Sequence, residues 1–549
     1  SGPLTDVVNL KITANGAPVE WRRDPFDMFV ILLDAPAKTT ALEVDLSYLS
    51  PIAGGNFTAG PNSTANLAVL SWNTLLLFPP GKDASEIFVE GTIRVPDGWR
   101  VASALDHDDA GKFQRATLAT YVDSPVILGR YFKTVALPAV PNAPVHRINI
   151  VSESNGDLEA PATFAADYAR LVAEAGAAFG SYHFSKYDWL LTLSDDVAHF
   201  GLEHHESSDN RMPEATLSED VLRRGLGSLL SHEYAHSWNG KFRRPAAMLS
   251  PDYQKPMDGS LLWVYEGLTQ YMGLLLATRS GLWSQEYYRE NLANVAAGFD
   301  IQPGRTWRPL ADTATAAQLL FPSADAWRSL RRGTDFYDES ILLWLEVDSI
   351  IRAKTDGRAS LDDFTRRFHG GPGGKPEVKP YTFDDIVANL NAVAPYDWRT
   401  HLTTRITSLS PRAPMAGVTA NGWKLVFNDT PNEAVAGSEK RNKLVDVSHS
   451  LGLTIREDGT IRDAILGRPA ANAGIGPGMK IVAVNGRGYT RAVLEAALKE
   501  KGTMDLLMEN NNFFRTHSVD YHDGLRYPHL VRDESVKDGL ATVLAAKAK

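Results

Sequence analysis

Residues 232–236 read His-Glu-Tyr-Ala-His and combine two imidazoles with a carboxylate at a spacing that suits metal chemistry. On a helix, positions four residues apart lie about 40° apart around the axis and roughly 6 Å apart along it, so His232 and His236 can converge on one ion. Zinc binds imidazole nitrogens at about 2.0–2.1 Å in a tetrahedral arrangement. Glu233 points about 100° around the same helix and can address a water molecule at the metal. The segment therefore predicts a zinc site with Glu233 as the base.

A third protein ligand is needed, because catalytic zinc takes three and leaves the fourth position for water. Glu266 lies among apolar side chains between residues 261 and 272, where an unpartnered carboxylate would be costly to bury. Glycines and prolines between residues 240 and 259 let the chain turn, so that the second helix can return beside the first. The sequence predicts one Zn²⁺ per chain, held by His232, His236 and Glu266.

Helical segments are expected to position these side chains. The residue pattern predicts helices over 163–179, 216–240, 261–278 and 339–354, and a strand over 189–193. Thr216 and Glu219 have the spacing of a capping box at the start of the histidine-bearing helix. Residues 161–410 are therefore predicted to form one mainly helical domain.

Strands dominate both flanking regions. Within residues 1–160, apolar residues alternate with polar ones between Gly, Pro, Asn and Asp turns, as over residues 42–48, which indicates an antiparallel β-sandwich-like domain. Short strands return over residues 411–549, with one helix near residues 491–499. The predicted fold class is multidomain α+β with three domains.

Composition narrows the functional class of the chain. Its 549 residues contain no Cys, which excludes disulfides, thiolate zinc sites and cysteine nucleophiles. A net charge of −10 argues against binding nucleic acid. No run of about 18 apolar residues occurs, so we expect a soluble protein without a membrane span. Avoidance of Cys suits an oxidising compartment and favours a periplasmic or secreted location.

Residues 232–240 and 263–267 together resemble the gluzincin zinc metallopeptidases, especially the aminopeptidase N family. Residues 200–204 resemble the exopeptidase motif of those enzymes, which implies that Glu203 grips the substrate amine. Tyr337 resembles the tyrosine that steadies the oxyanion, although Glu339 and Ser340 depart from the Lys-Gly that follows it in the family. Gln270 stands where thermolysin-like endopeptidases carry an aspartate that orients a histidine, and the absence of that aspartate favours the aminopeptidase comparison.

The similarity is closer to the glycyl aminopeptidase family and spans most of the chain. Residues 201–204, residues 121–129 and the C-terminal region carry it. The resemblance implies a β-rich N-terminal domain, a thermolysin-like catalytic domain and a C-terminal PDZ-like domain. It also implies release of N-terminal Gly or Ala from peptides with a free amino terminus. The implied catalytic residues are Glu233 and Tyr337, and the implied substrate-binding residues are Gly201, Leu202, Glu203 and His204.

The C-terminal region resembles a PDZ domain of the bacterial protease-associated type through residues 450–455, 470–479 and 481–486. In that reading, Leu451 to Leu453 leave backbone N–H groups free beside a sheet edge, where they can hold the C-terminus of a peptide by β-augmentation. The alternative is a packing domain whose groove is closed by its neighbours.

Two other functions remain open at the level of sequence. One is a zinc endopeptidase that uses the PDZ-like domain to capture peptide ends, which would accept substrates with a blocked amine. The other is a catalytically silent peptide-binding scaffold, which would require loss of a zinc ligand or of Glu233, and all four residues are present.

Overall fold

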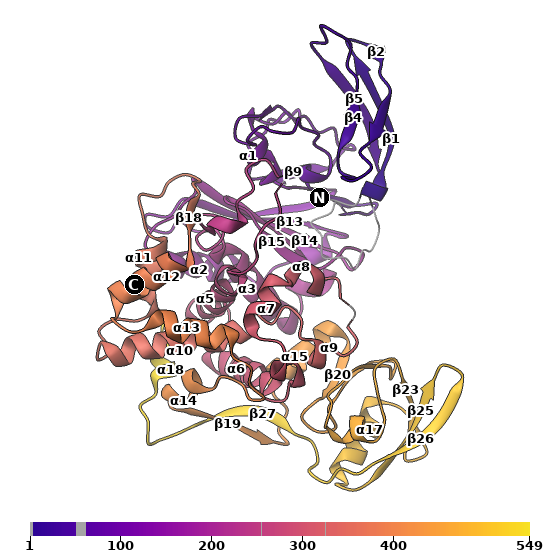
Figure 1. Ribbon diagram of the computed structural model, residues 1–549, viewed down its shortest axis with the longest axis vertical. Coiled ribbons are helices and arrows are strands. Elements are labelled where there is room, and N and C mark those ends of the chain that lie inside the picture. Colours follow the sequence, from indigo (N-terminus) through magenta and orange to yellow (C-terminus); the bar gives the residue numbers. More distant parts are fainter. Residues whose placement is uncertain (1–3, 51–61, 254, 324, 549) are drawn as a thin grey trace.

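The computed structural model describes residues 4–50, 62–253, 255–323 and 325–548. Figure 1 shows a β-rich N-terminal part at one end, a sheet and helices in the middle, and a small β/α module at the other end. The expected α+β class, with a β-rich N-terminal region and a helical central domain, is confirmed.

The N-terminal part is built from small antiparallel sheets. Its strands are β1 (Val7–Ala14), β2 (Ala17–Pro18), β3 (Trp21–Arg23), β4 (Ile31–Leu33), β5 (Leu42–Tyr48), β6 (Asn62–Ser63), β7 (Leu67–Leu70), β8 (Phe88–Val89), β9 (Arg100–Ser103), β10 (Ala116–Thr117) and β11 (Val126–Gly129). Two of the sheets have the orders β2-β1-β5 and β6-β7-β11-β9. The strand predicted over residues 42–48 is β5, but Leu42 and Val44 are exposed, so its alternation does not mark a buried face.

A five-stranded mixed sheet lies beneath the helix that carries the histidines. Its strands are β12 (Tyr131–Ala136), β13 (Val145–Ser152), β14 (Lys186–Leu193), β16 (Ser207–Met212) and β15 (Phe200–Glu203), in that spatial order. The central three are parallel, and β12 and β15 are antiparallel edge strands. The sheet takes strands from both sides of residue 160, where the first domain boundary was expected. Its edge strand β15 carries Gly201, Leu202 and Glu203.

The middle of the chain is built mainly from helices, as predicted. They are α2 (Phe164–Phe179), α3 (Asp220–Ala235), α4 (Leu262–Tyr265), α5 (Gly267–Arg279), α6 (Gln285–Asp300), α10 (Glu339–Lys354), α11 (Leu361–His369), α12 (Phe383–Val393) and α13 (Trp398–Thr407). The predictions over 163–179 and 339–354 are confirmed as α2 and α10. No helix in the described parts of the chain is long and apolar enough to cross a membrane.

Two predicted helices differ from the observed ones. The helix expected over 216–240 is α3 preceded by a 3-10 turn, Glu214–Leu217. The capping box is wrong, because the Thr216 hydroxyl donates to the carbonyl of Pro213 and Glu219 becomes the N-cap residue. The helix expected over 261–278 divides at Glu266 into α4 and α5.

Buried hydrogen bonds tie α3 to the sheet. The indole N–H of Trp189 on β14 donates to the carbonyl of Leu230 at 3.2 Å. His146 on β13 lies between the carbonyl of Pro144 and the hydroxyl of Tyr234 on α3, each 2.7 Å away. A carbonyl only accepts, so Nδ1 carries the proton and Nε2 accepts from Tyr234. Burial lowers the pKa of His146 to about 4.

This buried histidine predicts a pH-dependent stability. The unfolded chain protonates His146 near its ordinary pKa of 6.5, and the folded chain protonates it only near a pKa of about 4. The contribution of His146 to the free energy of unfolding is therefore full above pH 6.5 and falls as the pH drops towards 4. Between pH 7.5 and 5 we expect the parent protein to lose about 2 kcal/mol more unfolding free energy than His146→Phe. Denaturant titrations in the presence of a metal chelator measure this difference. An equal pH dependence of the unfolding free energy in the two proteins would contradict the prediction.

The C-terminal part consists of an inserted module and a segment that packs on the helices. The module contains β20 (Leu444–Val447), β21 (Leu453–Arg456), β22 (Ile461–Ala464), α16 (Pro469–Asn472), β23 (Lys480–Val484), β24 (Arg487–Gly488), α17 (Arg491–Lys499), β25 (Met504–Asn510) and β26 (Phe513–Val519). On either side of it, β19 (Trp423–Asn428) pairs with β27 (Tyr527–Arg532). The expected C-terminal tail is part of the central core, because α18 (Gly539–Leu544) is buried there and Arg279 donates to the carbonyl of Val543.

The expectation of free N–H groups at residues 451–453 is wrong. The N–H groups of Ser450, Leu451 and Gly452 all donate to the carbonyl of Val447, at 2.8–3.1 Å. Strand β21 pairs with β20 on one side and β22 on the other, so neither of its edges is open. The preceding strand of the same chain lies where an added peptide strand was expected.

Candidate active site

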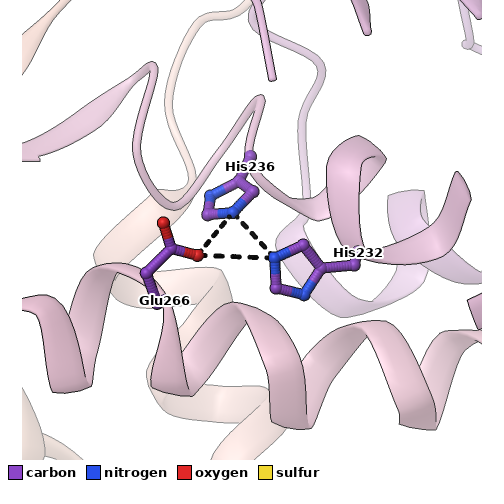
Figure 2. A group of neighbouring side chains, drawn as sticks. All are labelled: His232, His236 and Glu266. Atoms are coloured by element: carbon purple, nitrogen blue, oxygen red, sulfur yellow. Dashed lines mark hydrogen bonds and ion pairs between the residues drawn. The ribbon is translucent and has the colours of Figure 1, made fainter. Parts of the chain in front are cut away.

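Two histidines of α3 and its C-cap meet the carboxylate of Glu266 (Figure 2). The Nε2 atoms of His232 and His236 lie 3.0 Å apart, and Glu266 Oε2 lies 3.4 Å and 3.1 Å from them respectively. The His236 side chain is buried, whereas those of His232 and Glu266 keep 12% and 13% of their surface exposed. The cluster is therefore buried on one side and reachable from the other.

The donor set fits a zinc ion. Two imidazole nitrogens and a carboxylate oxygen point at one another, which is the combination that zinc takes in catalytic sites. His236 Nδ1 faces the carbonyl of Asn239 at 2.9 Å and so carries the proton, which leaves a lone pair on Nε2 directed at the cluster. A cation between the three atoms relieves the repulsion of these lone pairs.

Asn239 is the residue that orients His236, a role that was not predicted from the sequence. Its side-chain amide donates to the carbonyls of Val264 and Tyr265, at 2.8 and 3.1 Å. The loop after α3 is thereby joined to the end of α4, just before Glu266. Gln270, the position compared with the aspartate of endopeptidases, instead donates to Asp338 at 3.0 Å.

Close packing between α3 and α5 brings Glu266 to the histidines. A Cβ atom at Gly273 would lie 2.9 Å from the Cα of His232, so only glycine allows the helices to approach so closely. The break between α4 and α5 falls at Glu266, whose carboxylate then turns towards α3.

Glu233 lies beside the cluster, against strand β15. A Cβ atom at Gly201 would lie 2.1 Å from Oε1 of Glu233, so the backbone of the strand is packed directly on this carboxylate. Burial raises the pKa of Glu233 well above its ordinary value, and the nearby carboxylates of Glu203 and Glu266 raise it further, while His236 opposes them. Gly201 therefore fixes where the carboxylate can lie.

Gly201→Ala is expected to displace Glu233 without touching the three zinc-type ligands. A shift of about 1 Å in a reacting group can cost roughly 10²-fold in rate, so we expect kcat to fall by about that factor with zinc content unchanged. Steady-state kinetics with metal analysis measure both quantities. Full activity in Gly201→Ala would show that the carboxylate has room that the packing does not indicate.

Glu203, at the end of β15, is held beside the cluster by its neighbours. The hydroxyl of Tyr265 donates to Glu203 Oε1. Burial by itself raises the pKa of Glu203, but His236 and Lys241 together hold it below its ordinary value. Oxygens of Glu203 and Glu233 and a ring nitrogen of His236 all lie within 4.8 Å of one another.

The N-terminal part contributes Asp123, which was not predicted as a site residue. Its carboxylate accepts from the N–H of His205 at 2.8 Å, lies 3.3 Å from His204 Nδ1 and pairs with Lys241. Burial opposes ionisation of Asp123, yet Lys241 and the two histidines hold its pKa well below the ordinary value. His204 therefore faces Asp123, and this pair fixes the turn that follows Glu203.

Tyr337 reaches the cluster from the segment before α10. Its ring centroid lies 5.9 Å from that of His232, and its hydroxyl is close enough to Glu266 for that carboxylate to affect its pKa. Burial, followed by the surrounding carboxylates, raises its pKa well above the ordinary value, so the hydroxyl keeps its proton. Glu339, which stands where the family has Lys, has a structural role of its own. Its carboxylate is buried and paired with Arg305 and Arg332.

Two family models match the chain. Residues 226–343 match M61 glycyl aminopeptidase, and residues 1–130 match the Peptidase M61 N-terminal domain. The first segment contains the two histidines, Glu233, Glu266 and Tyr337. No curated protein matches the chain.

Solved structures resemble the fold. An aminopeptidase N family protein from Idiomarina loihiensis aligns with a TM-score of 0.79 at 16% identity, over 99% of this chain and 92% of that one. An M1 zinc metallopeptidase from Deinococcus radiodurans aligns with a TM-score of 0.47 at 17% identity, over 74% and 87% of the two chains. The first match shows a shared fold over almost the whole length. The β-rich and the histidine-bearing parts thus carry domains of the M61 glycyl aminopeptidase family, and the protein is a zinc aminopeptidase.

Proposed function

We propose that this enzyme removes the first residue from peptides with a free amino terminus and prefers N-terminal Gly or Ala. The observation that carries the proposal is the short separation of Glu203 from the His236 and Glu233 side chains, all within 4.8 Å of one another. An ammonium group paired with Glu203 places only the first carbonyl of a peptide beside these groups. The match to the glycyl aminopeptidase family supports the preference for a small first residue.

His232, His236 and Glu266 would hold one Zn²⁺ per chain. When bound, the ion supplies Lewis acidity, which polarises the scissile carbonyl and acidifies the attacking water. Glu233 accepts a proton from that water and later delivers a proton to the leaving amine. Tyr337 donates a hydrogen bond to the carbonyl oxygen as negative charge develops on it.

Strand β15 would bind the substrate main chain. It is an edge strand of the five-stranded sheet, so a peptide can extend the sheet beside Gly201 and Leu202 while its ammonium group reaches Glu203. The pair of His204 and Asp123 supports the chain where this strand ends.

We also propose the three domains expected over residues 1–160, 161–410 and 411–549, with strands β12 and β13 and helix α18 joined to the central one and a PDZ-like module in the third. The module supports this by its four-stranded sheet β24-β23-β25-β26 and the helix α17. Its paired strand β21 favours the interpretation in which the module packs and leaves no open groove for a peptide C-terminus.

The proposal is tested with a glycine-initiated peptide whose amino terminus is free or acetylated. We expect release of glycine from the free peptide alone, loss of activity with a chelator and recovery with Zn²⁺. Internal cleavage of both peptides would contradict the aminopeptidase proposal and favour an endopeptidase.

Glu203→Ala is expected to reduce the preference for a free amine. A charge-assisted hydrogen bond contributes about 1.5–3 kcal/mol, so the ratio of kcat/KM for free over acetylated peptide should fall by at least about tenfold. The loss should appear mainly in KM for the free peptide. An unchanged ratio in a variant that retains zinc would remove Glu203 from this role.

A further inference from the structure

Tyr265 contacts both of the groups between which the proposed reaction places the first residue of the substrate. Its hydroxyl binds the carboxylate of Glu203, and its ring centroid lies 5.1 Å from that of His236, at an interplanar angle of 43°. The side chain is buried, with 6% of its surface exposed. The ring therefore spans the distance from the proposed amine anchor to a proposed zinc ligand.

The ring is packed closely in this position. A Cβ atom at Gly240 would lie 2.8 Å from Cζ and 3.0 Å from the hydroxyl oxygen of Tyr265, so the loop after α3 is packed against the back of the ring. Gly240 has a φ of +140°, which side chains rarely adopt. The Tyr265 carbonyl is also held, by Asn239 at 3.1 Å and Thr269 at 2.7 Å.

We propose that the ring of Tyr265 limits the first residue of the substrate to a side chain no larger than a methyl group. This rests on the proposed function: the ammonium group is at Glu203 and the first carbonyl lies beside His236. The α-carbon joins these two groups, so it must lie alongside the ring that spans the same distance. A rigid aromatic face there leaves space for hydrogen or methyl and excludes longer side chains.

The hydroxyl of Tyr265 has a separate positioning role. It holds Oε1 of Glu203 and leaves the other carboxylate oxygen for the substrate ammonium. Removal of the hydroxyl and removal of the ring should therefore have different effects. Tyr265→Phe keeps the ring and loses the hydrogen bond, whereas Tyr265→Ala loses both.

The test compares peptides that differ only in an N-terminal Gly or Leu. In Tyr265→Ala the ratio of kcat/KM for Leu over Gly should rise at least about tenfold, because each methylene admitted to a pocket is worth roughly 10–200-fold. In Tyr265→Phe the ratio should stay within about threefold of the parent value, while KM rises for both peptides. Tyr265→Val serves in the same comparison if the alanine variant does not fold.

A binding measurement provides a readout that does not depend on turnover. In the Glu233→Gln background, calorimetry should show that Tyr265→Ala lowers the Kd of the Leu peptide relative to the Gly peptide by a similar factor. An unchanged Leu/Gly ratio in folded, zinc-loaded Tyr265→Ala or Tyr265→Val would overturn the inference and leave the proposed function intact. Failure of the parent protein to release any N-terminal residue would instead overturn the proposed function.

Discussion

Glu233→Gln is expected to lower kcat by about 10²–10⁴-fold, the range that proton transfer by a positioned side chain contributes. The amide has the same shape as the carboxylate, so the packing against Gly201 should persist. The amide cannot accept a proton from water. Residue 233 is not one of the three proposed zinc ligands, His232, His236 and Glu266, whose atoms converge in Figure 2. We therefore expect the variant to bind zinc and to fold as the parent does.

Metal analysis, thermal unfolding and steady-state kinetics on one preparation measure this result. Glu286→Gln, in the exposed first turn of α6, makes the same chemical change away from the site and should leave kcat unchanged. A Glu233→Gln protein that retains zinc and more than a tenth of the parent kcat would assign the base to another group.

The zinc-type cluster could be predicted because its geometry is largely local. The spacing of His232 and His236 places their imidazoles on the same side of a helix once that helix forms. Glu266 lies among apolar residues, where a carboxylate without a partner is costly to bury. The break in the helix at Glu266 could not be predicted in the same way. It depends on contacts between α5 and its neighbours, including the close approach of Gly273 to His232.

The residues that support the cluster come from distant parts of the chain, and periodicity carries no signal for them. Asn239 acts through its backbone carbonyl and through bonds to residues 25 and 26 positions later. Asp123 belongs to the β-rich N-terminal part and reaches the turn after β15 only in the folded protein. A signal for Tyr265 was present, because a tyrosine directly preceding a proposed ligand must lie near the metal.

The C-terminal module illustrates the limit of a motif. Residues 450–453 have the composition of a carboxylate-binding loop, and the structure shows the N–H groups of residues 450–452 bound to the carbonyl of Val447. A sequence specifies which groups can donate, whereas the neighbouring strand decides whether a ligand or the chain itself accepts.

Glu266→Gln is expected to abolish zinc binding at micromolar concentrations and, with it, activity. The amide removes the negative charge that balances a divalent ion, and each ligand of a zinc site contributes on the order of 3 kcal/mol, or about 10²-fold in affinity. The two imidazoles then remain alone, 3.0 Å apart. Activity should fall to the level of chelator-treated parent protein and recover in part at high Zn²⁺, where His232 and His236 still offer two ligands.

The two carboxylate variants together decide which side chains hold the metal. His236 can belong to either of two sets of ligand atoms, one with His232 and Glu266 and one with Glu203 and Glu233. We expect Glu233→Gln to retain zinc and Glu266→Gln to lose it, because only the first set includes two imidazoles that point at each other. The opposite pattern, with zinc lost in Glu233→Gln and kept in Glu266→Gln, would place the ion between the two carboxylates of β15 and α3. The amine anchor and the base would then have to be sought elsewhere.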